Sequence, residues 1–363
     1  MSYLKWLITT FSLVLFFAAL IVAVNFYVDH HGVRLSLFSG GISIHQSQIT
    51  YPDGINQHMF NPELIFRNSE KFDSFLFGSS RTSVIHVEKI PDGRFYNMSY
   101  SLGLPTQHLA ILKAFAARRI KIKHVVIGLD EIAFAMPAAA TQKHLVRIMH
   151  PDIDGPDRLE IFGMYFFRKP ELEELGRWHD RVRLGKTNGR VITNPQGVNL
   201  GWLEKDQLIE KAARPIFHFT ADQYKPVTYG PKEMDKAFKS IEELVALAQA
   251  HHFQLTFFIS PIYSQLYLNN AEALLTAKVR LAQITDYYDF SGLNSVTTNP
   301  VNYYEEQHYR YRVGDMIIER IFGVDVATLP KDFGSLVTKQ NVGQHLEKQK
   351  RELEQYLKSH SLQ

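Results

Sequence analysis

The segment Ser74-Phe75-Leu76-Phe77-Gly78-Ser79-Ser80-Arg81 is the part of the sequence that most constrains the fold. Three large apolar residues are followed at once by a glycine, two serines and an arginine. A short apolar run that stops at glycine is typical of a strand buried in a sheet. Polar residues directly after such a strand lie at its carboxyl end, where open parallel sheets bind their ligands. We therefore expect a buried strand that ends beside a functional site.

Strand-like and helix-like patterns alternate along the chain after this segment. Further strands are expected at 95–100, 124–129, 254–259 and 287–290, and helices at 106–119, 232–250 and 270–283. Strands that alternate with helices are typical of a parallel sheet covered by helices. The sequence therefore predicts an α/β fold, with a three-layer sandwich around a parallel sheet.

Other segments interrupt this alternation and define the expected domains. Residues 29–69 are polar, contain Gly and Pro, and are expected to form a neck or entry segment. Residues 137–230 contain seven prolines and many charges, and are interpreted as an insertion or lid subdomain. We expect the core of the fold in 70–136 and 231–325, followed by a charged, helical tail in 326–363.

The N-terminus carries a long apolar run. From Trp6 to Val28 the chain has 23 residues without a charge. At about 1.5 Å per residue this run is long enough to cross a hydrocarbon core of about 30 Å. A cleaved signal peptide has a shorter apolar region, of about 7–15 residues, and then a small-residue cleavage site. We therefore predict that residues 1–28 form an uncleaved, single-pass transmembrane anchor.

Composition and charge exclude several classes of protein. A hydrophobic share of 45% in 363 residues can fill a core, which excludes wholesale disorder. The net charge is only +3 and the two signs are interspersed, so no nucleic-acid partner is expected. The chain has no cysteine, which excludes disulfides, Cys-ligated zinc and a thiolate nucleophile.

No metal or cofactor is expected either. The histidine pairs at 30–31 and 251–252 have no glutamate at the helical spacing of a zinc site. The segment Gly185-Lys186-Thr187 matches the last three residues of a phosphate-binding loop, but Asp180 stands where the first glycine of that motif is required. We therefore expect no phosphate-binding loop there.

Ser80 and His308 are the candidate catalytic pair. A serine at the end of the first strand, with a helix after it, has an exposed hydroxyl and a helix N-terminus beside it. That hydroxyl needs a base, which His308 supplies, and Glu305 precedes His308 by three residues and could orient its ring. Asp289, at the end of the last strand, is a rival orienting acid. A helix cap formed by the serines at 79 and 80 is the structural alternative.

The candidate motifs occur in the order of the four blocks of the SGNH (GDSL-type) hydrolase superfamily, which the chain resembles over residues 70–135 and 230–323. The corresponding residues are Ser80, Gly103, the segment Gly128-Leu129-Asp130-Glu131, and Glu305 with His308. The Gly-Ser-Ser-Arg opening, the Tyr-Asn-Met-Ser segment and the late His-Tyr-Arg are similar to a membrane-anchored bacterial branch. That branch includes the lipoteichoic acid D-alanylation protein and the alginate and peptidoglycan O-acetylation proteins.

The resemblance implies a role for each of these residues. Ser80 would be the nucleophile, His308 the general base and Glu305 the orienting acid. The backbone N–H groups of Ser80 and Gly103 would donate to the oxyanion. Asp130 stands where the superfamily usually has Asn, and a carboxylate cannot donate to an oxyanion unless it is protonated.

Three further candidate residues lie near these motifs. Asn97 follows the second strand and is a candidate oxyanion or substrate residue. Arg81 either meets an anionic substrate or forms an ion pair at the surface or the sheet edge. Asp130, together with its neighbour Glu131, could instead cap a helix.

By resemblance, the chain would be an envelope-anchored O-acyltransferase or esterase for a cell-surface polysaccharide, working through an acyl-serine intermediate. A multi-spanning membrane acyltransferase is an expected partner. The flanking charges decide the orientation only weakly, and the resemblance favours a domain outside the cytoplasm on the inner membrane. The alternatives are a non-catalytic scaffold that keeps the SGNH fold, and a domain inside the cytoplasm.

Overall fold

The computed structural model describes residues 3–38, 48–52, 54–135, 144–183, 190–218, 227, 230–324 and 326–360. Contacts divide the chain into two compact units. The anchor unit comprises Met1–Arg67 and Thr141–Ile192, and the sheet unit comprises Asn68–Ala140 and Thr193–Gln363. The expected neck therefore groups with the first half of the expected insertion, and the second half groups with the α/β core.

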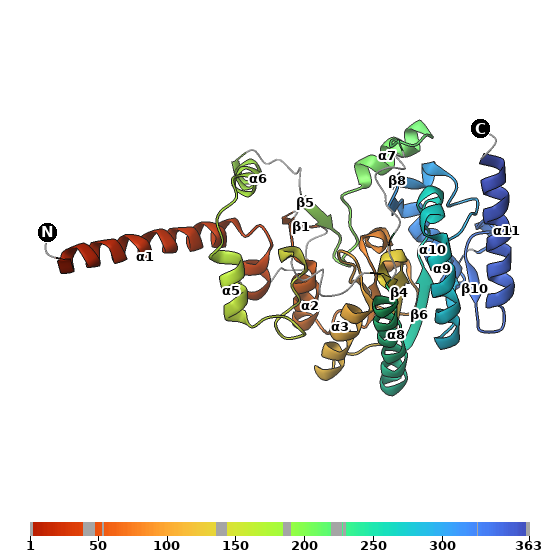
Figure 1. The fold of residues 1–363 in the computed structure, drawn as a ribbon, viewed down its shortest axis with the longest axis horizontal. Helices are drawn as coiled ribbons and strands as arrows, with labels where there is room; N and C mark the ends of the chain where they lie inside the picture. The colour runs from red at the N-terminus through yellow and green to blue at the C-terminus, as the bar shows by residue number, and fades with distance from the viewer. Residues whose placement is uncertain are drawn as a thin grey trace. The chain divides into compact units, whose positions relative to one another are not determined.

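The anchor unit is mainly helical (Figure 1). Its elements are α1 (Tyr3–Val28), β1 (Ile49–Pro52), α2 (Gln57–Arg67), α5 (Arg158–Phe166), α6 (Leu172–Arg183) and β5 (Arg190–Thr193), with β1 and β5 paired. Among the described residues, α1 is the one helix long and apolar enough to cross a membrane. The prediction of a long apolar helix at the N-terminus is confirmed.

Polar contacts explain why the neck and the first half of the insertion fold together. The Asn56 amide donates to the carbonyl of Ile148 at 2.8 Å, and the Glu63 carboxylate lies 2.8 Å from the buried ring of His150. These groups are far apart in sequence, and burial without a partner would cost each of them free energy. The local sequence pattern does not identify such partners.

The sheet unit contains a six-stranded sheet in the order β10-β7-β6-β4-β2-β3. Its strands are β2 (Ser74–Phe77), β3 (Phe95–Asn97), β4 (His124–Leu129), β6 (Gln254–Ile259), β7 (Tyr287–Asp289) and β10 (Ser335–Val337). All neighbours pair in parallel except β7 and β10, which are antiparallel. The prediction of a mixed α/β fold with a mostly parallel sheet is confirmed.

Helices pack on both faces of this sheet. The helices of the sheet unit are α3 (Pro105–Ala117), α7 (Leu203–Ala212), α8 (Pro231–His251), α9 (Ser264–Ile284), α10 (Tyr311–Phe322) and α11 (Val342–His360). On one face, Phe75 of β2 contacts Phe115 of α3 with ring centroids 5.0 Å apart, and α8 packs beside α3 (Figure 1). On the other face, Leu76 shares a buried cluster with Val313 and Ile317 of α10. Alternate residues of one strand therefore enter different layers, as the two-residue period of a strand requires.

The expected charged tail contributes to the sheet. Residues 335–337 form β10, which pairs with β7, and α11 then packs against α9. A short hairpin of β8 (Tyr303–Glu305) and β9 (His308–Tyr309) lies outside the main sheet and leads into α10.

Candidate active site

The two serines after β2 have different roles. Ser79 is the N-cap of a short 3₁₀ helix over Ser80–Val84, and its hydroxyl accepts from the backbone N–H of Arg81 at 3.2 Å. Ser80 is exposed, and its Oγ lies 2.7 Å from Nε2 of His308. The helix cap and the candidate nucleophile are therefore neighbouring residues, and the hydroxyl of Ser80 is free for chemistry.

The hairpin of β8 and β9 presents His308 to that hydroxyl. Glu305 lies opposite His308 in the hairpin register, and its Oε1 forms a short hydrogen bond with Nδ1 of the ring. The second carboxylate oxygen accepts from the backbone N–H of Gln307 at 3.1 Å. Burial alone would raise the pKa of Glu305, but the hydrogen bond and charge of His308 hold that pKa below its usual value. An ionised Glu305 then fixes the ring with Nε2 facing Ser80.

Gly103 packs directly against the backbone that carries the serines. Its φ is +57°, and a Cβ on it would lie 2.3 Å from the carbonyl carbon of Gly78 and 2.3 Å from the N atom of Ser79. Only glycine fits this close approach. Among the described residues, neither the N–H of Gly103 nor that of Ser80 has a hydrogen-bond partner. Both donors are therefore available to a developing oxyanion.

Arg81 is buried, not at the surface or the sheet edge. Its guanidinium contacts both carboxylate oxygens of Glu131, at 2.5 and 2.6 Å, and lies 3.4 Å from Asp130. Its Nε donates to the carbonyl of Gln307 at 2.9 Å. Burial would lower the pKa of Arg81, but the charges of Glu131 and Asp130 hold it above the usual value. Arg81 therefore joins the segment after β4 to the loop that carries His308.

Asp130 is the N-cap of the 3₁₀ helix over Glu131–Phe134. Its Oδ1 accepts from the backbone N–H groups of Ile132 and Ala133, at 3.2 and 3.3 Å. Burial raises the pKa of Asp130, and the charge of Arg81 opposes this shift. Asp130 therefore caps a helix, as one of its two interpretations predicts. In these contacts its side chain accepts hydrogen bonds.

Asn97 is also fully engaged inside the fold. Its amide donates to the carbonyl of Thr82 at 2.9 Å, and its oxygen accepts from the N–H of Ser99 at 3.0 Å. The side chain is buried. It holds β3 against the 3₁₀ helix that begins at Ser80, and so supports the backbone that carries Ser80.

Trp202, which precedes α7, is a residue beside the site that the sequence patterns did not reveal. Its ring stacks on that of Tyr304, with centroids 4.9 Å apart, and lies 5.6 Å from the ring of His308. Arg310 donates to Asp206 of α7 at 2.9 Å, which fixes the helix beside the hairpin. A lone tryptophan in a proline-rich segment carries no periodic signal that would have identified it.

Tyr303, Tyr304 and Tyr309 are buried among core residues. They pack the hairpin, and Tyr304 additionally supports Trp202.

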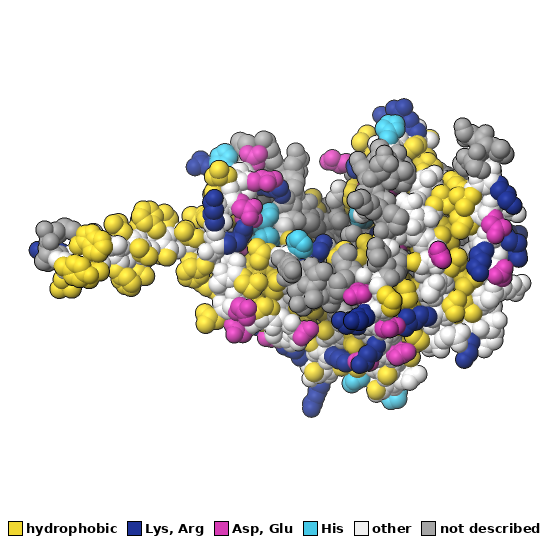
Figure 2. Space-filling model, in the orientation of Figure 1, with side chains coloured by type: hydrophobic (Ala, Val, Ile, Leu, Met, Phe, Trp, Pro, Cys, Tyr) yellow, Lys and Arg dark blue, Asp and Glu magenta, His cyan; other side chains and the backbone are white. Residues whose placement is uncertain are grey.

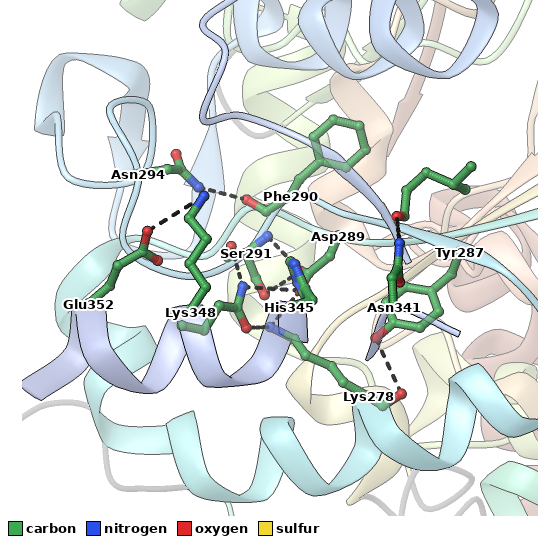
Figure 3. A network of polar contacts seen from close by, with 12 residues as sticks. Lys278, Tyr287, Asp289, Phe290, Ser291, Asn294, Asn341, His345, Lys348 and Glu352 are labelled. Atoms are coloured by element: carbon green, nitrogen blue, oxygen red, sulfur yellow. Dashed lines mark hydrogen bonds and ion pairs between the residues drawn. The ribbon is translucent and has the colours of Figure 1, made fainter. Parts of the chain in front are cut away.

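Asp289 belongs to a different network from His308. Its carboxylate lies 2.8 Å from Nζ of Lys278 and 2.8 Å from Nε2 of His345 (Figure 3). The amide of Gln349 also donates to it, at 3.1 Å. The rival interpretation of Asp289 as the orienting acid is therefore wrong, because its charge is used to join β7, α9 and α11.

The described residues contain no group of three or more His, Asp or Glu side chains placed to hold a metal ion. The segment Gly185-Lys186-Thr187 lies outside the described residues.

A scan against protein-family models finds no match for the chain, and a search of curated proteins finds no significantly similar sequence.

Proposed function

We propose that the chain is a membrane-anchored serine esterase or O-acyltransferase with an SGNH-like three-layer fold. The observation that carries this proposal is a series of hydrogen bonds that runs from Glu305 through His308 to the exposed hydroxyl of Ser80. A hydroxyl activated by an oriented imidazole is the constellation used for acyl transfer through a covalent intermediate. The substrate class, acyl esters of a cell-surface polysaccharide, comes from the resemblance of the motifs.

The proposed reaction has two steps that use the same groups. Oγ of Ser80 attacks the ester carbonyl carbon while Nε2 of His308 takes the hydroxyl proton, and the N–H groups of Ser80 and Gly103 donate to the oxyanion. The bond to the leaving alcohol then breaks, and His308 returns the proton to that alcohol. In the second step Nε2 of His308 takes the proton of an acceptor hydroxyl, from sugar or water, as its oxygen attacks the acyl carbon. The bond from that carbon to Oγ of Ser80 then breaks, and His308 returns the proton to Oγ.

The proposed location follows from α1. Its length and apolar surface suit a single pass through a membrane. The resemblance of the motifs favours the inner membrane, with the sheet unit on the extracytoplasmic side. We propose a multi-spanning membrane acyltransferase as the partner that delivers the acyl group across the bilayer.

A scaffold without catalytic activity is the second candidate, and Asp130 favours it. Where the superfamily has a side-chain donor to the oxyanion, this chain has a buried acceptor that caps a helix. Losing one such donor costs about 10²–10³ in rate in a well-studied protease. A site with only two backbone donors would accordingly be slow.

Labelling with a serine-directed fluorophosphonate distinguishes the two candidates. The full chain in detergent is treated with the probe, alongside Ser80→Ala and His308→Ala. Ser83→Ala is the matched control, because Ser83 lies in the same helical turn with its hydroxyl bound to the carbonyl of Ser80 at 2.6 Å. The proposal expects labelling of wild type and the control, and none of the two site variants. Unlabelled, folded wild type would support the scaffold.

A further inference from the structure

The exposed part of α1 is shorter than the helix itself. Residues 3–20 are exposed apart from Ala18, whereas most residues from 21 to 28 are partly or fully buried, with Ala23 and Tyr27 still exposed. This stretch of 18 residues spans about 27 Å at about 1.5 Å per residue, which is close to the hydrocarbon thickness of about 30 Å. Hydrophobic side chains cover this part of the helix (Figure 2). The bilayer surface would therefore lie near Leu20.

The final turns of α1 are fixed to the end of α5 by specific contacts. The buried amide of Asn25 donates to the carbonyl of Phe166 at 3.0 Å and to that of Arg168 at 2.7 Å. The ring of Phe26 packs on that of Phe166, with centroids 5.1 Å apart. These contacts hold α5 only a few residues beyond the point where α1 would leave the hydrocarbon.

At this place α5 exposes a continuous apolar surface. Phe162 contacts Phe38 and Phe167, with ring centroids 5.9 and 6.2 Å apart. Leu159 precedes Phe162 by one helical turn and is 81% exposed, while Phe167 is 58% exposed and Phe38 39%. We call Phe38, Leu159, Phe162 and Phe167 the α5 surface. In water, exposure of Leu159, Phe167 and Phe38 so close together would be costly.

A second aromatic pair lies at the same level of α1. The ring of Tyr27 is 67% exposed and meets that of Trp178 of α6 edge to face, with centroids 5.4 Å apart. Tyr27 follows Leu20 by seven residues, which is about 10 Å along the helix axis. Tyrosine and tryptophan are enriched at the level of the lipid headgroups.

We propose that the α5 surface inserts into the interfacial region of the phospholipid bilayer, so that the anchor unit lies on the membrane and does not hang from a free helix. The partner is lipid because ring contacts through the buried Phe166 join this surface to Phe26 of the helix that would span the bilayer. The inference rests on the proposed transmembrane position of α1. It assigns the anchor unit a membrane-binding function of its own.

Site-directed spin labelling tests this inference, because the chain contains no cysteine. Single cysteines replace Val14 in α1, Leu159 and Phe167 in the α5 surface, and Lys239, an exposed residue of α8. The full-length variants carry a nitroxide in nanodiscs of phosphatidylethanolamine and phosphatidylglycerol. Collision with oxygen, which concentrates in lipid, is compared with collision with a water-soluble nickel chelate.

The expected result is a gradient of depth. The oxygen-to-nickel collision ratio should be highest at Val14, several-fold above the Lys239 control at Leu159 and Phe167, and lowest at Lys239. Ratios at Leu159 and Phe167 equal to the control, with Val14 deep, would overturn the inference and leave the span intact. A water-accessible Val14 would instead show that the proposed span is wrong. Nitroxides at 159 and 167 shielded from both reagents would mean that protein covers the surface, which also overturns the inference.

Discussion

Replacing Asp289 by asparagine is expected to destabilise the sheet unit strongly. The Asp289 side chain is fully buried, and its charge faces Nζ of Lys278 at 2.8 Å (Figure 3). The ring of His345 and the amide of Gln349 contact the same oxygen. An uncharged amide would leave the Lys278 ammonium buried without a counter-charge.

The size of the effect follows from this burial. Removing one partner of a buried ion pair costs about 3–5 kcal/mol, because the other charge stays behind in a poorly polarisable environment. We expect the lower end of that range, because burial lowers the pKa of Lys278 and its ammonium can release a proton once the carboxylate is gone. In a domain of this size about 3 kcal/mol lowers the Tm by about 6–12 °C.

Thermal unfolding followed by tryptophan fluorescence measures this loss. Replacing Trp6 and Trp178 by phenylalanine leaves Trp202 as the reporter of the sheet unit. Asp286→Asn is the matched control, because Asp286 is exposed three residues earlier and should shift the Tm little. Combining Asp289→Asn with Lys278→Met should cost less than the sum of the two single changes, since it removes both charges.

Two results would refute this reasoning. The first is an Asp289→Asn protein as stable as the Asp286→Asn control. The second is strict additivity of the two changes in the double variant, which would mean that the charges at 278 and 289 do not interact.

Three further predictions concern the site and its surroundings. Glu305→Gln should slow fluorophosphonate labelling of Ser80 by about 10²–10⁴, because the wrong imidazole tautomer becomes stable; labelling kinetics at wild-type rate would contradict the orienting role. Gly103→Ala should lower the Tm, since the added Cβ would lie 2.3 Å from neighbouring backbone atoms at a φ of +57°. Gly163→Ala in α5 should raise the Tm slightly, because its added Cβ would have no neighbouring atom within 4 Å. Burial raises the pKa of Asp289, but Lys278 and His345 hold that pKa well below 3.8, so its contribution to stability should be complete above pH 3.8 and be lost as the pH falls through the folded-state pKa. Denaturant unfolding between pH 2 and 6 should show a constant difference between wild type and Asp289→Asn above pH 4, and this difference should narrow toward pH 2.

The sequence predicted the parallel strands and α8 well because their signals are local, whereas α9 begins six residues before its predicted start and α2 lies in a neck for which no helix was predicted. The strands at 124–129 and 254–259 have the predicted bounds, and the helix at 231–251 differs from its prediction by one residue at each end. The strand after Phe95 ends earlier than predicted, at Asn97. Apolar runs and periodic patterns reflect burial within one element, so they can be recognised without knowing what lies opposite.

The partners of charged residues could not be predicted in the same way. Asp289 and Glu305 each end a strand and were rival candidates to orient His308, yet only Glu305 reaches its ring. Arg81 likewise gave no sign that it would be buried against Glu131. A buried charge needs a counter-charge at hydrogen-bond distance, and that distance is set by how remote segments pack.

The sequence by itself determined an apolar N-terminal helix, an α/β sheet, and a serine and a histidine in the order required for one site. The tertiary structure alone decided that Ser80 and His308 lie 2.7 Å apart, and that Trp202 stands beside them. It also decided that β10 closes the sheet in the antiparallel sense. The physical reason is that element type depends on neighbours along the chain, whereas a site depends on contacts between residues more than 200 positions apart, which form only when the whole sheet is assembled.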